Sequence, residues 1–234
     1  MRNLTERPRR RWTSYAKIQG QIGHLLRNHR FQLRRERIRG LRYLDIGCGW
    51  NVHDHLINMD YLWHPAVDLC WDIRRGLPFE NGSLKGIFSE HCLEHFSIST
   101  VEKILSECRR VLAPGGTLRI VVPDTERYLR VYVRQCDADS AERFPFQEQE
   151  ALRGRFVPML SVNRVFYQDR DSPAGHRTMF DFPFLDLLLQ EAGFRAAVKR
   201  SFREGRDPAL LVDCESRAVE SLYVEATVTT DGVE

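Results

Sequence analysis

From residue 43 onward, short apolar runs with strand character alternate with longer stretches of helical periodicity. The run TLRIVVP at residues 117–123 is rich in β-branched residues, and the stretch before it, from Val101 to Leu112, repeats apolar residues at helical spacing. Strands that are apolar on both faces are typical of parallel sheets covered by helices. The pattern therefore predicts an α/β fold, and 234 residues are enough for one substantial core.

Seven strands and four helical stretches are expected along the chain. The predicted strands are RYLDIG (42–47), LINMDY (56–61), VDLCWDI (67–73), LKGIFSEH (84–91), TLRIVVP (117–123), AAVKRSF (196–202) and SLYVEATVT (221–229). The predicted helices begin near Ser14, run through RFQLRRERIRG to Gly40, span Val101–Leu112 before the sequence APGG, and cover FPFLDLLLQEAGF with an end at Gly193.

The stretch YLDIGCGWNVHDHLINMDY limits which ligand the sheet can bind. Gly47 and Gly49 form a tight turn after the first strand, but Val52 stands where a dinucleotide-binding motif has its third glycine, which argues against an NAD-dependent oxidoreductase. Only about eight residues separate Gly49 from the strand that carries Asp60, whereas a parallel crossover usually needs ten or more. We therefore expect a shortened first crossover, with its helix reduced to a turn.

Charge is distributed unevenly along the chain. Residues 1–42 hold 13 Lys and Arg against two Glu, a net charge of +11, so the remaining −8 brings the whole chain to +3. Residues 1–13 have the composition of a disordered segment. A basic arm on an acidic body can bind nucleic acid, contact a phosphorylated or membrane-surface substrate, or pack across the body itself, and the sequence leaves these roles open.

The cysteines and the apolar runs indicate a cytoplasmic protein. Six cysteines without a CxxC pair argue against a zinc ribbon or a disulfide framework and fit reduced thiols. No apolar run approaches the length of a membrane span, and the Arg-rich start lacks the apolar core of a signal peptide.

Four motifs occur in the order typical of class I S-adenosylmethionine (SAM)-dependent methyltransferases, and the sequence resembles that family. They are the glycine turn LDIGCG, the acidic strand ends, an LEH segment within LPFENGSLKGIFSEHCLEHF, and RRVLAPGGTLRIVVPD. VPDTERY and GHRTMFDFPFLDLLLQEAGF are similar to a subgroup associated with polysaccharide or glycan modification. The resemblance implies a Rossmann-like, doubly wound, mostly parallel seven-stranded sheet whose last strand is antiparallel. Residues 43–234 would form this domain and residues 1–42 a basic helical arm.

The resemblance also implies SAM as cofactor. SAM has no pyrophosphate and needs no third glycine, while Gly47 and Gly49 let the backbone lie against its methionine part. Asp60 is predicted to accept the ribose hydroxyls, and Asp68 is a rival because its spacing from Gly47 is closer to the common family distance. The other predicted cofactor contacts are Asp45 at the loop or the ammonium group, Cys48, Ser89, Asp72 at the adenine amino group and Ile73 at the adenine face.

Candidate catalytic groups follow the fourth and fifth strands. Methyl transfer from a sulfonium is an in-line displacement, so the protein mainly aligns the acceptor and removes its proton. His91 is a candidate base because the reference pKa of histidine lies near working pH, and Glu90 is another if it is desolvated. The same edge carries Glu94, His95 and Asp124. The ending SEHC lacks the Asn/Asp-Pro-Pro-aromatic element of enzymes that methylate base amino groups.

No metal is expected from the sequence. In ubiquinone-type O-methyltransferases, a carboxylate three residues before an EH pair helps to hold a divalent cation. This chain has His91 at that position, before Glu94 and His95, so the site loses an oxygen ligand that hard cations prefer.

The segment from about Thr125 to Phe180 is predicted to be an insertion that selects the acceptor. Long insertions in compact domains are often lids or binding loops, and this one combines aromatic residues with arginines. Such a surface suits a sugar, a nucleotide-linked sugar or a phosphate-bearing acceptor. His176, in AGHRTMFD, is a further acid/base candidate.

Three functions remain open at this point. The leading one is a methyltransferase acting on a small-molecule or glycan-like acceptor. A nucleic-acid-directed methyltransferase could hold phosphates with the basic arm, but the arm offers only Trp12, Tyr15 and Phe31 for base stacking. The third is a SAM-binding partner subunit that does not turn over. The acceptor, the methylated atom and the choice between monomer and homodimer are left open.

Overall fold

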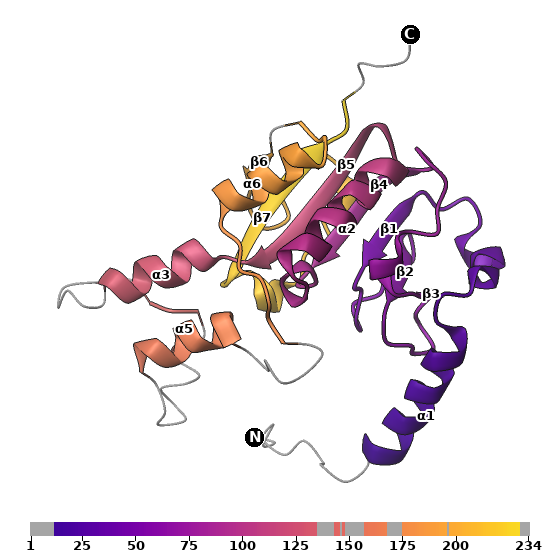
Figure 1. Ribbon diagram of the computed structural model, residues 1–234, viewed down its shortest axis with the longest axis horizontal. Helices are drawn as coiled ribbons and strands as arrows, with labels where there is room; N and C mark the ends of the chain where they lie inside the picture. The colour runs from indigo at the N-terminus through magenta and orange to yellow at the C-terminus, as the bar shows by residue number, and fades with distance from the viewer. Residues whose placement is uncertain are drawn as a thin grey trace.

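The computed structural model describes residues 12–134, 143–145, 147, 157–167, 175–195 and 197–229. Seven strands form one sheet in the order β3-β2-β1-β4-β5-β7-β6 (Figure 1). Their bounds are Tyr43–Ile46 (β1), Ile57–Asp60 (β2), Leu69–Cys70 (β3), Leu84–Glu90 (β4), Leu112–Pro123 (β5), Val198–Arg200 (β6) and Ser221–Thr227 (β7). The pairs from β3 to β5 are parallel, whereas β7 is antiparallel to both of its neighbours. The predicted Rossmann-like sheet with an antiparallel last strand is confirmed.

Three of the four predicted helices are present, and the described residues add two more in the segment predicted to be an insertion. The α-helices are Trp12–Leu26 (α1), Ile98–Val111 (α2), Thr125–Arg134 (α3), Pro158–Tyr167 (α5) and Phe182–Glu191 (α6). The predicted helix through RFQLRRERIRG is instead two short 3₁₀ turns, Arg30–Arg34 and Glu36–Ile38, because Arg35 between them has extended dihedrals (φ −61°, ψ 133°). The residues APGG, predicted to follow a helix, lie inside β5, whose pairing with β4 shifts register near Gly86.

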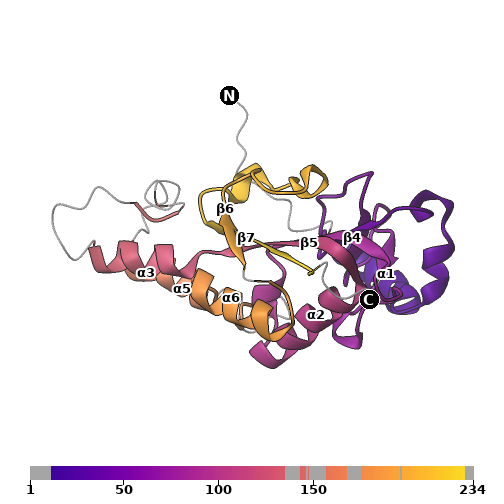
Figure 2. The same ribbon diagram turned by 90° about the horizontal axis from the view of Figure 1, so that it is seen from above.

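The sheet has a helical face and an irregular face, and the alternation along its strands supplies both cores. On one face Ile87, Ile120 and Leu222 join the large core cluster that α2 and α6 cover (Figure 2). On the other face Phe88, Val121 and Tyr223 pack against Leu210 of the 3₁₀ turn Pro208–Leu210. The odd and even positions of each central strand therefore pack into different layers.

The first crossover contains no helix in the segment from Gly47 to Leu56, as predicted. The amides of Gly47 (2.8 Å) and Cys48 (3.1 Å) both donate to the carbonyl of Met59 in the next strand. These bonds satisfy backbone groups that a helix would otherwise satisfy, so the chain can cross to β2 in a short loop.

The N-terminal helix is followed by a segment that packs against the β3 edge of the sheet. The Asn28 amide donates to the carbonyl of Cys70 (3.1 Å), and the Gln32 side chain accepts from the Cys70 amide (2.9 Å). Several arginines of this arm bind backbone carbonyls of the body: Arg27 that of Tyr61, Arg35 that of Val67, Arg37 those of Leu56 and His53, and Arg42 that of Ser83. These contacts fit the interpretation in which the arm packs across the body.

Among the described residues, no helix is long and apolar enough to cross a membrane.

Helices α3 and α5 of the predicted insertion project beyond the end of β5 and pack on each other (Figure 1). They have a small core of their own made by Tyr128, Val131, Phe144 and Val165. Tyr128 and Phe144 are two of the aromatic residues of the insertion, whose aromatic residues were expected to form an acceptor-binding surface, and both are buried in this core. Residues 1–11 and most of the segment from 135 to 156 lie outside the described residues, so the predicted disorder of the N-terminus and the predicted lid stay predictions.

Candidate functional site

The glycine turn after β1 is held in shape by a carboxylate from β2. Gly47 and Gly49 both have left-handed φ angles, +75° and +51°, which disfavour side chains. A Cβ on Gly47 would also lie 2.7 Å from the Cys92 sulfur. Asp60 accepts from the Gly49 amide through Oδ2 (2.9 Å) and from the Leu62 amide through Oδ1 (2.7 Å). The structure therefore brings three predicted cofactor residues, Gly47, Gly49 and Asp60, into one turn.

The rival carboxylate, Asp68, lies deeper. Its Oδ2 accepts from both the backbone and the side-chain amide of Asn58 (2.9 Å each) and pairs with Arg37 at 3.1 Å. Asp68 is 3% exposed, so it braces the start of β2. Asp60, at the end of its strand and partly exposed, is the better placed of the two for a ribose.

The predicted adenine contacts lie beside the arm. Asp72 binds Arg74 through two side-chain bonds of 2.7 Å, and hydrogen bonding from Arg74 lowers the pKa of its carboxyl. The Asp72 amide donates to the Asn28 side chain (2.9 Å), while Ile73 is buried. Arg27 lies 3.8 Å from the ring centroid of Tyr61, next to Asp60. Asn28 and Arg27 of the arm therefore help to hold Asp72 and Tyr61 in place.

Three buried groups lie near the glycine turn, at the ends of the neighbouring strands β1 and β4. Burial, with smaller contributions from Glu90 and Asp60, raises the pKa of Asp45 well above its ordinary 3.8. Burial also raises the pKa of the Cys48 thiol, which therefore stays protonated. Ser89 is buried, and its hydroxyl has no hydrogen-bond partner among the residues that the structure describes.

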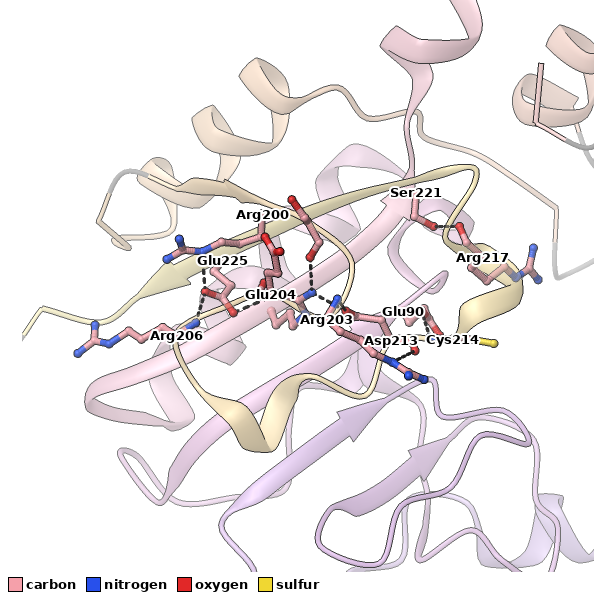
Figure 3. Close-up of polar contacts among 12 residues, drawn as sticks. Glu90, Arg200, Arg203, Glu204, Arg206, Asp213, Cys214, Arg217, Ser221 and Glu225 are labelled. Carbon is pink, nitrogen blue, oxygen red and sulfur yellow. Dashed lines mark hydrogen bonds and ion pairs between the residues drawn. The ribbon is translucent and has the colours of Figure 1, made fainter. Parts of the chain in front are cut away.

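The two catalytic candidates at the end of β4 have different surroundings. Glu90 accepts from the Cys214 amide (2.9 Å), and burial raises the pKa of its carboxyl (Figure 3). His91 has a left-handed backbone (φ +47°), which is strained for a residue with a side chain. Its Nε2 lies 2.9 Å from Ser221 Oγ, and its Nδ1 lies 3.4 Å from Glu94 Oε1. Because the Ser221 hydroxyl donates to the Arg217 carbonyl (2.8 Å), its oxygen is left to accept from Nε2.

His176 is brought to the LEH segment from the far end of the insertion. Its ring lies edge-on to that of His95, with centroids 5.2 Å apart, and its Nδ1 lies 2.9 Å from the Val165 carbonyl. The amides of Arg177 (2.7 Å) and Thr178 (3.1 Å) donate to the Glu94 carbonyl. These backbone bonds join two segments about 80 residues apart in the sequence.

An ion-pair network that the sequence reading missed fixes the irregular face behind the site. Arg119 of β5 is fully buried and binds Asp213 through both carboxylate oxygens and Glu225 at 3.2 Å. Asp213 also accepts from the Arg203 amide, and Glu225 accepts from the Arg206 amide and the Arg200 side chain (Figure 3). This network places Cys214 where it can bind Glu90. The only sequence signal was a single arginine inside the apolar run TLRIVVP.

The middle of the chain matches a known family. Residues 59–120, from the end of β2 into β5, match the model of the methyltransferase domain family. The glycine turn precedes the matched stretch. No curated protein matches the chain.

Solved structures with a similar arrangement include three proteins of low identity. One is a SAM-dependent methyltransferase of Thermotoga maritima, described as a possible histamine N-methyltransferase, with 15% identity, 93% of this chain and 96% of that chain covered, and a TM-score of 0.46. A second is 1,6-didemethyltoxoflavin-N1-methyltransferase of Burkholderia thailandensis with bound S-adenosylhomocysteine, at 15% identity, 93% and 80% coverage and a TM-score of 0.47. The third is a putative methyltransferase of Haloferax volcanii in complex with the activator Trm112, at 12% identity, 95% and 98% coverage and a TM-score of 0.46. Similarities this weak carry no argument about an acceptor or a partner.

Proposed function

We propose that this chain, a SAM-dependent methyltransferase of the class I fold by its family match and strand order, methylates a small-molecule or glycan-like acceptor by in-line displacement. One observation carries the assignment of the cofactor site: the turn Gly47–Gly49, closed by Asp60 from the neighbouring strand end. Ligands of open α/β sheets bind at the carboxyl ends of the strands, next to the point where strand order reverses. Here that point lies between β1 and β4, beside the turn.

The residues present fit the cofactor. A Cβ on Gly49 would meet no atom within 4 Å, so the space beside this glycine is open to a ligand. Asp60 can accept the ribose hydroxyls with the lone pairs that its two backbone bonds leave free. The buried Ser89 hydroxyl offers a further polar contact. The cofactor supplies the activated methyl group, and these residues bind and orient it.

Glu90 is the residue best placed to take a proton from the acceptor. Its pKa is raised by burial, which moves a carboxyl toward the range in which it can accept a proton near neutral pH. Among the residues that the structure describes, only one of its oxygens accepts a hydrogen bond, which comes from the Cys214 amide. His91 faces acceptors with both ring nitrogens, so we assign it the role of positioning the chain at the end of β4.

The proposal is tested by calorimetric titration of SAM, S-adenosylhomocysteine and NAD. The wild type should bind both adenosyl ligands but not NAD, and Asp60→Asn should weaken binding about 10–100-fold because hydrogen bonds to a charged group contribute roughly 1.5–3 kcal/mol each. Asp68→Asn is the matched control: it should lower stability and leave the affinity within about twofold. If Asp68→Asn is the damaging change, the assigned ribose ligand is wrong, and if neither adenosyl ligand binds, the function is wrong.

Turnover separates an enzyme from a non-catalytic subunit. Transfer of labelled methyl from SAM to fractionated small-molecule and glycan pools should be detected with the wild type and should fall by about 10²–10⁴ in Glu90→Gln. Binding of SAM without transfer to any pool would favour the subunit, and transfer only to nucleic acid would favour the other alternative.

A further inference from the structure

Three potential metal ligands come together at the carboxyl edge, the edge of the sheet where the parallel strands have their carboxyl ends. They lie on the side of β4 and β5 rather than at the glycine turn. Glu94 and His95 come from the 3₁₀ turn Leu93–His95, and His176 comes from the segment before α6. One donor atom from each residue lies within 4.8 Å of the others. The sequence placed Glu94 and His95 together, but only the fold adds His176.

The carboxylate of Glu94 lacks the partners that a buried charge needs. Glu94 is 1% exposed, and neither of its oxygens has a hydrogen-bond partner among the described residues. His91 Nδ1 and His95 Nε2 approach the same oxygen, Oε1, at 3.4 and 4.0 Å. A buried, ionised carboxylate without donors is costly unless a cation compensates it.

The cation of Arg217, which interacts electrostatically with Glu94, already has a partner. Arg217 pairs with Glu220 through a contact of 2.7 Å, and that glutamate also accepts from the Tyr128 hydroxyl (3.1 Å). His91 is held between Glu94 and Ser221. Neither group donates a hydrogen bond to Glu94 in the described structure, so the charge is open to a further cation.

His176 is oriented as metal ligands usually are, whereas Nδ1 of His95 is buried without a hydrogen-bond partner among the described residues. His176 Nδ1 can donate to the Val165 carbonyl at 2.9 Å, which leaves Nε2 with its lone pair. His95 Nε2 faces Glu94 Oε1 at 4.0 Å. Donor atoms around one zinc ion lie up to roughly 4 Å apart, given Zn–N and Zn–O distances near 2.1 Å. Small side-chain rotations would therefore bring all three groups into one coordination sphere.

We propose that Glu94, His95 and His176 bind a divalent transition-metal ion of the zinc class. Two imidazoles and one carboxylate suit zinc or another imidazole-preferring metal better than magnesium or calcium, which prefer oxygen ligands. Three protein ligands leave at least one coordination position open, as in catalytic zinc sites. This ligand set differs from the one that the sequence discouraged, because the third group is His176 and not His91.

A small pocket adjoins two of the three proposed ligands, Glu94 and His176. Glu94, His176, Thr125 and Phe180 line this pocket, and the buried Thr125 hydroxyl has no hydrogen-bond partner within the described ranges. An ion here could hold an oxygen or nitrogen atom of the acceptor. That role rests on the proposed function, whereas binding of the ion does not.

Metal binding can be measured without SAM or acceptor. Protein treated with a chelator should bind one equivalent of Zn²⁺ by calorimetry, and Co²⁺ as a probe should give visible absorption bands of a low-symmetry site. His95→Ala and His176→Ala should each weaken binding by more than the roughly 10–100-fold typical of changes around a site's ligands. His29→Ala, a substitution of an exposed histidine of the arm, is the matched control and should bind like the wild type.

Two results would overturn the site. One is the absence of stoichiometric binding in the wild type, and the other is binding that persists unchanged in both histidine variants. Glu94→Gln, which keeps the shape of the side chain, should also abolish binding, but the histidine variants decide the matter if it does not fold. Titration of S-adenosylhomocysteine into His176→Ala should give wild-type affinity. A wild type that binds S-adenosylhomocysteine but no metal therefore overturns only this inference, and a wild type that binds metal but no adenosyl ligand overturns only the proposed function.

Discussion

The carboxylates at the two sides of the carboxyl edge differ in how well they are satisfied. On the side of β2, Asp60 and Asp68 accept backbone or side-chain N–H groups through bonds of 2.7 to 2.9 Å. On the side of β4, Glu94 is more deeply buried than either and accepts no hydrogen bond within the described structure. Buried polar groups are rarely left in this state. The carboxylates on the β2 side therefore hold a loop in shape, whereas Glu94 on the β4 side is open to a ligand that the chain itself does not supply.

Arg119 gives the strongest way to test how much an unsatisfied carboxylate costs this fold. Arg119→Met removes the buried cation beside Asp213 and Glu225, which keep only their bonds to backbone amides and to Arg200. We expect a loss of about 3–5 kcal/mol in the free energy of unfolding, measured by urea denaturation, because breaking a buried pair leaves uncompensated charge. Arg39→Met, at an exposed pair with Glu36, should change stability by less than about 0.5 kcal/mol. Equal effects of the two substitutions would contradict the comparison.

The ion pairs of Arg119 also illustrate what the sequence could and could not predict. Hydrophobic periodicity predicted all seven strands and the helices α2 and α6, since each buries a face at a regular spacing. It failed at residues 30–40, where helical spacing is present but the chain is held by tertiary bonds from the arm to Cys70. It also missed the irregular face of the sheet. That face depends on ion pairs of Arg119 whose partners lie 94 and 106 positions further along the sequence.

The site divides in the same way. Gly47, Gly49 and Asp60 could be found because the turn is local and its residues occur in a short motif. The approach of His176 to Glu94 could not, because backbone bonds across the sheet edge bring them together and no spacing in the sequence encodes such bonds. The orphaned state of Glu94 is likewise a property of packing alone.

Two glycine substitutions, Gly49→Ala and Gly40→Ala, can distinguish an effect on ligand binding from an effect of backbone strain alone. Gly49→Ala and Gly40→Ala both place a methyl group at a left-handed φ where no atom lies within 4 Å. Each should cost about 1–2 kcal/mol of stability. If the cofactor occupies the space beside Gly49, only Gly49→Ala should also weaken S-adenosylhomocysteine binding, by at least about tenfold in calorimetry. Equal affinities of the two variants would place the cofactor elsewhere.

Asp45 sharpens the comparison because it is a buried carboxyl whose pKa is raised rather than lowered. In the folded state it binds its proton more tightly than in the unfolded state, where its pKa is near 3.8. Its contribution to stability is therefore fully present below pH 3.8 and is lost as the pH rises toward the folded pKa. Each pH unit between the two pKa values corresponds to about 1.4 kcal/mol.

Asp45→Asn should remove this dependence, so the variant should lose less stability than the wild type as the pH rises from 4 to 8 in urea denaturation. Glu36→Gln, on the exposed arm, serves as the control and should follow the wild-type curve. Parallel curves for Asp45→Asn and the wild type would mean that Asp45 is compensated, like Asp60.

The smallest expected effect on stability is at His91, which links the two sides of the comparison. Asn tolerates left-handed backbone well, so His91→Asn should keep the end of β4 in place and relieve part of the strain at φ +47°. It removes the contacts to Ser221 and Glu94, and the two effects should nearly cancel, within about 1 kcal/mol. With the imidazole gone, Glu94 loses one of the two groups that lower its pKa, so the variant should bind Zn²⁺ with an affinity that falls more steeply below neutral pH than that of the wild type. An unchanged pH dependence would show that His91 does not act on Glu94.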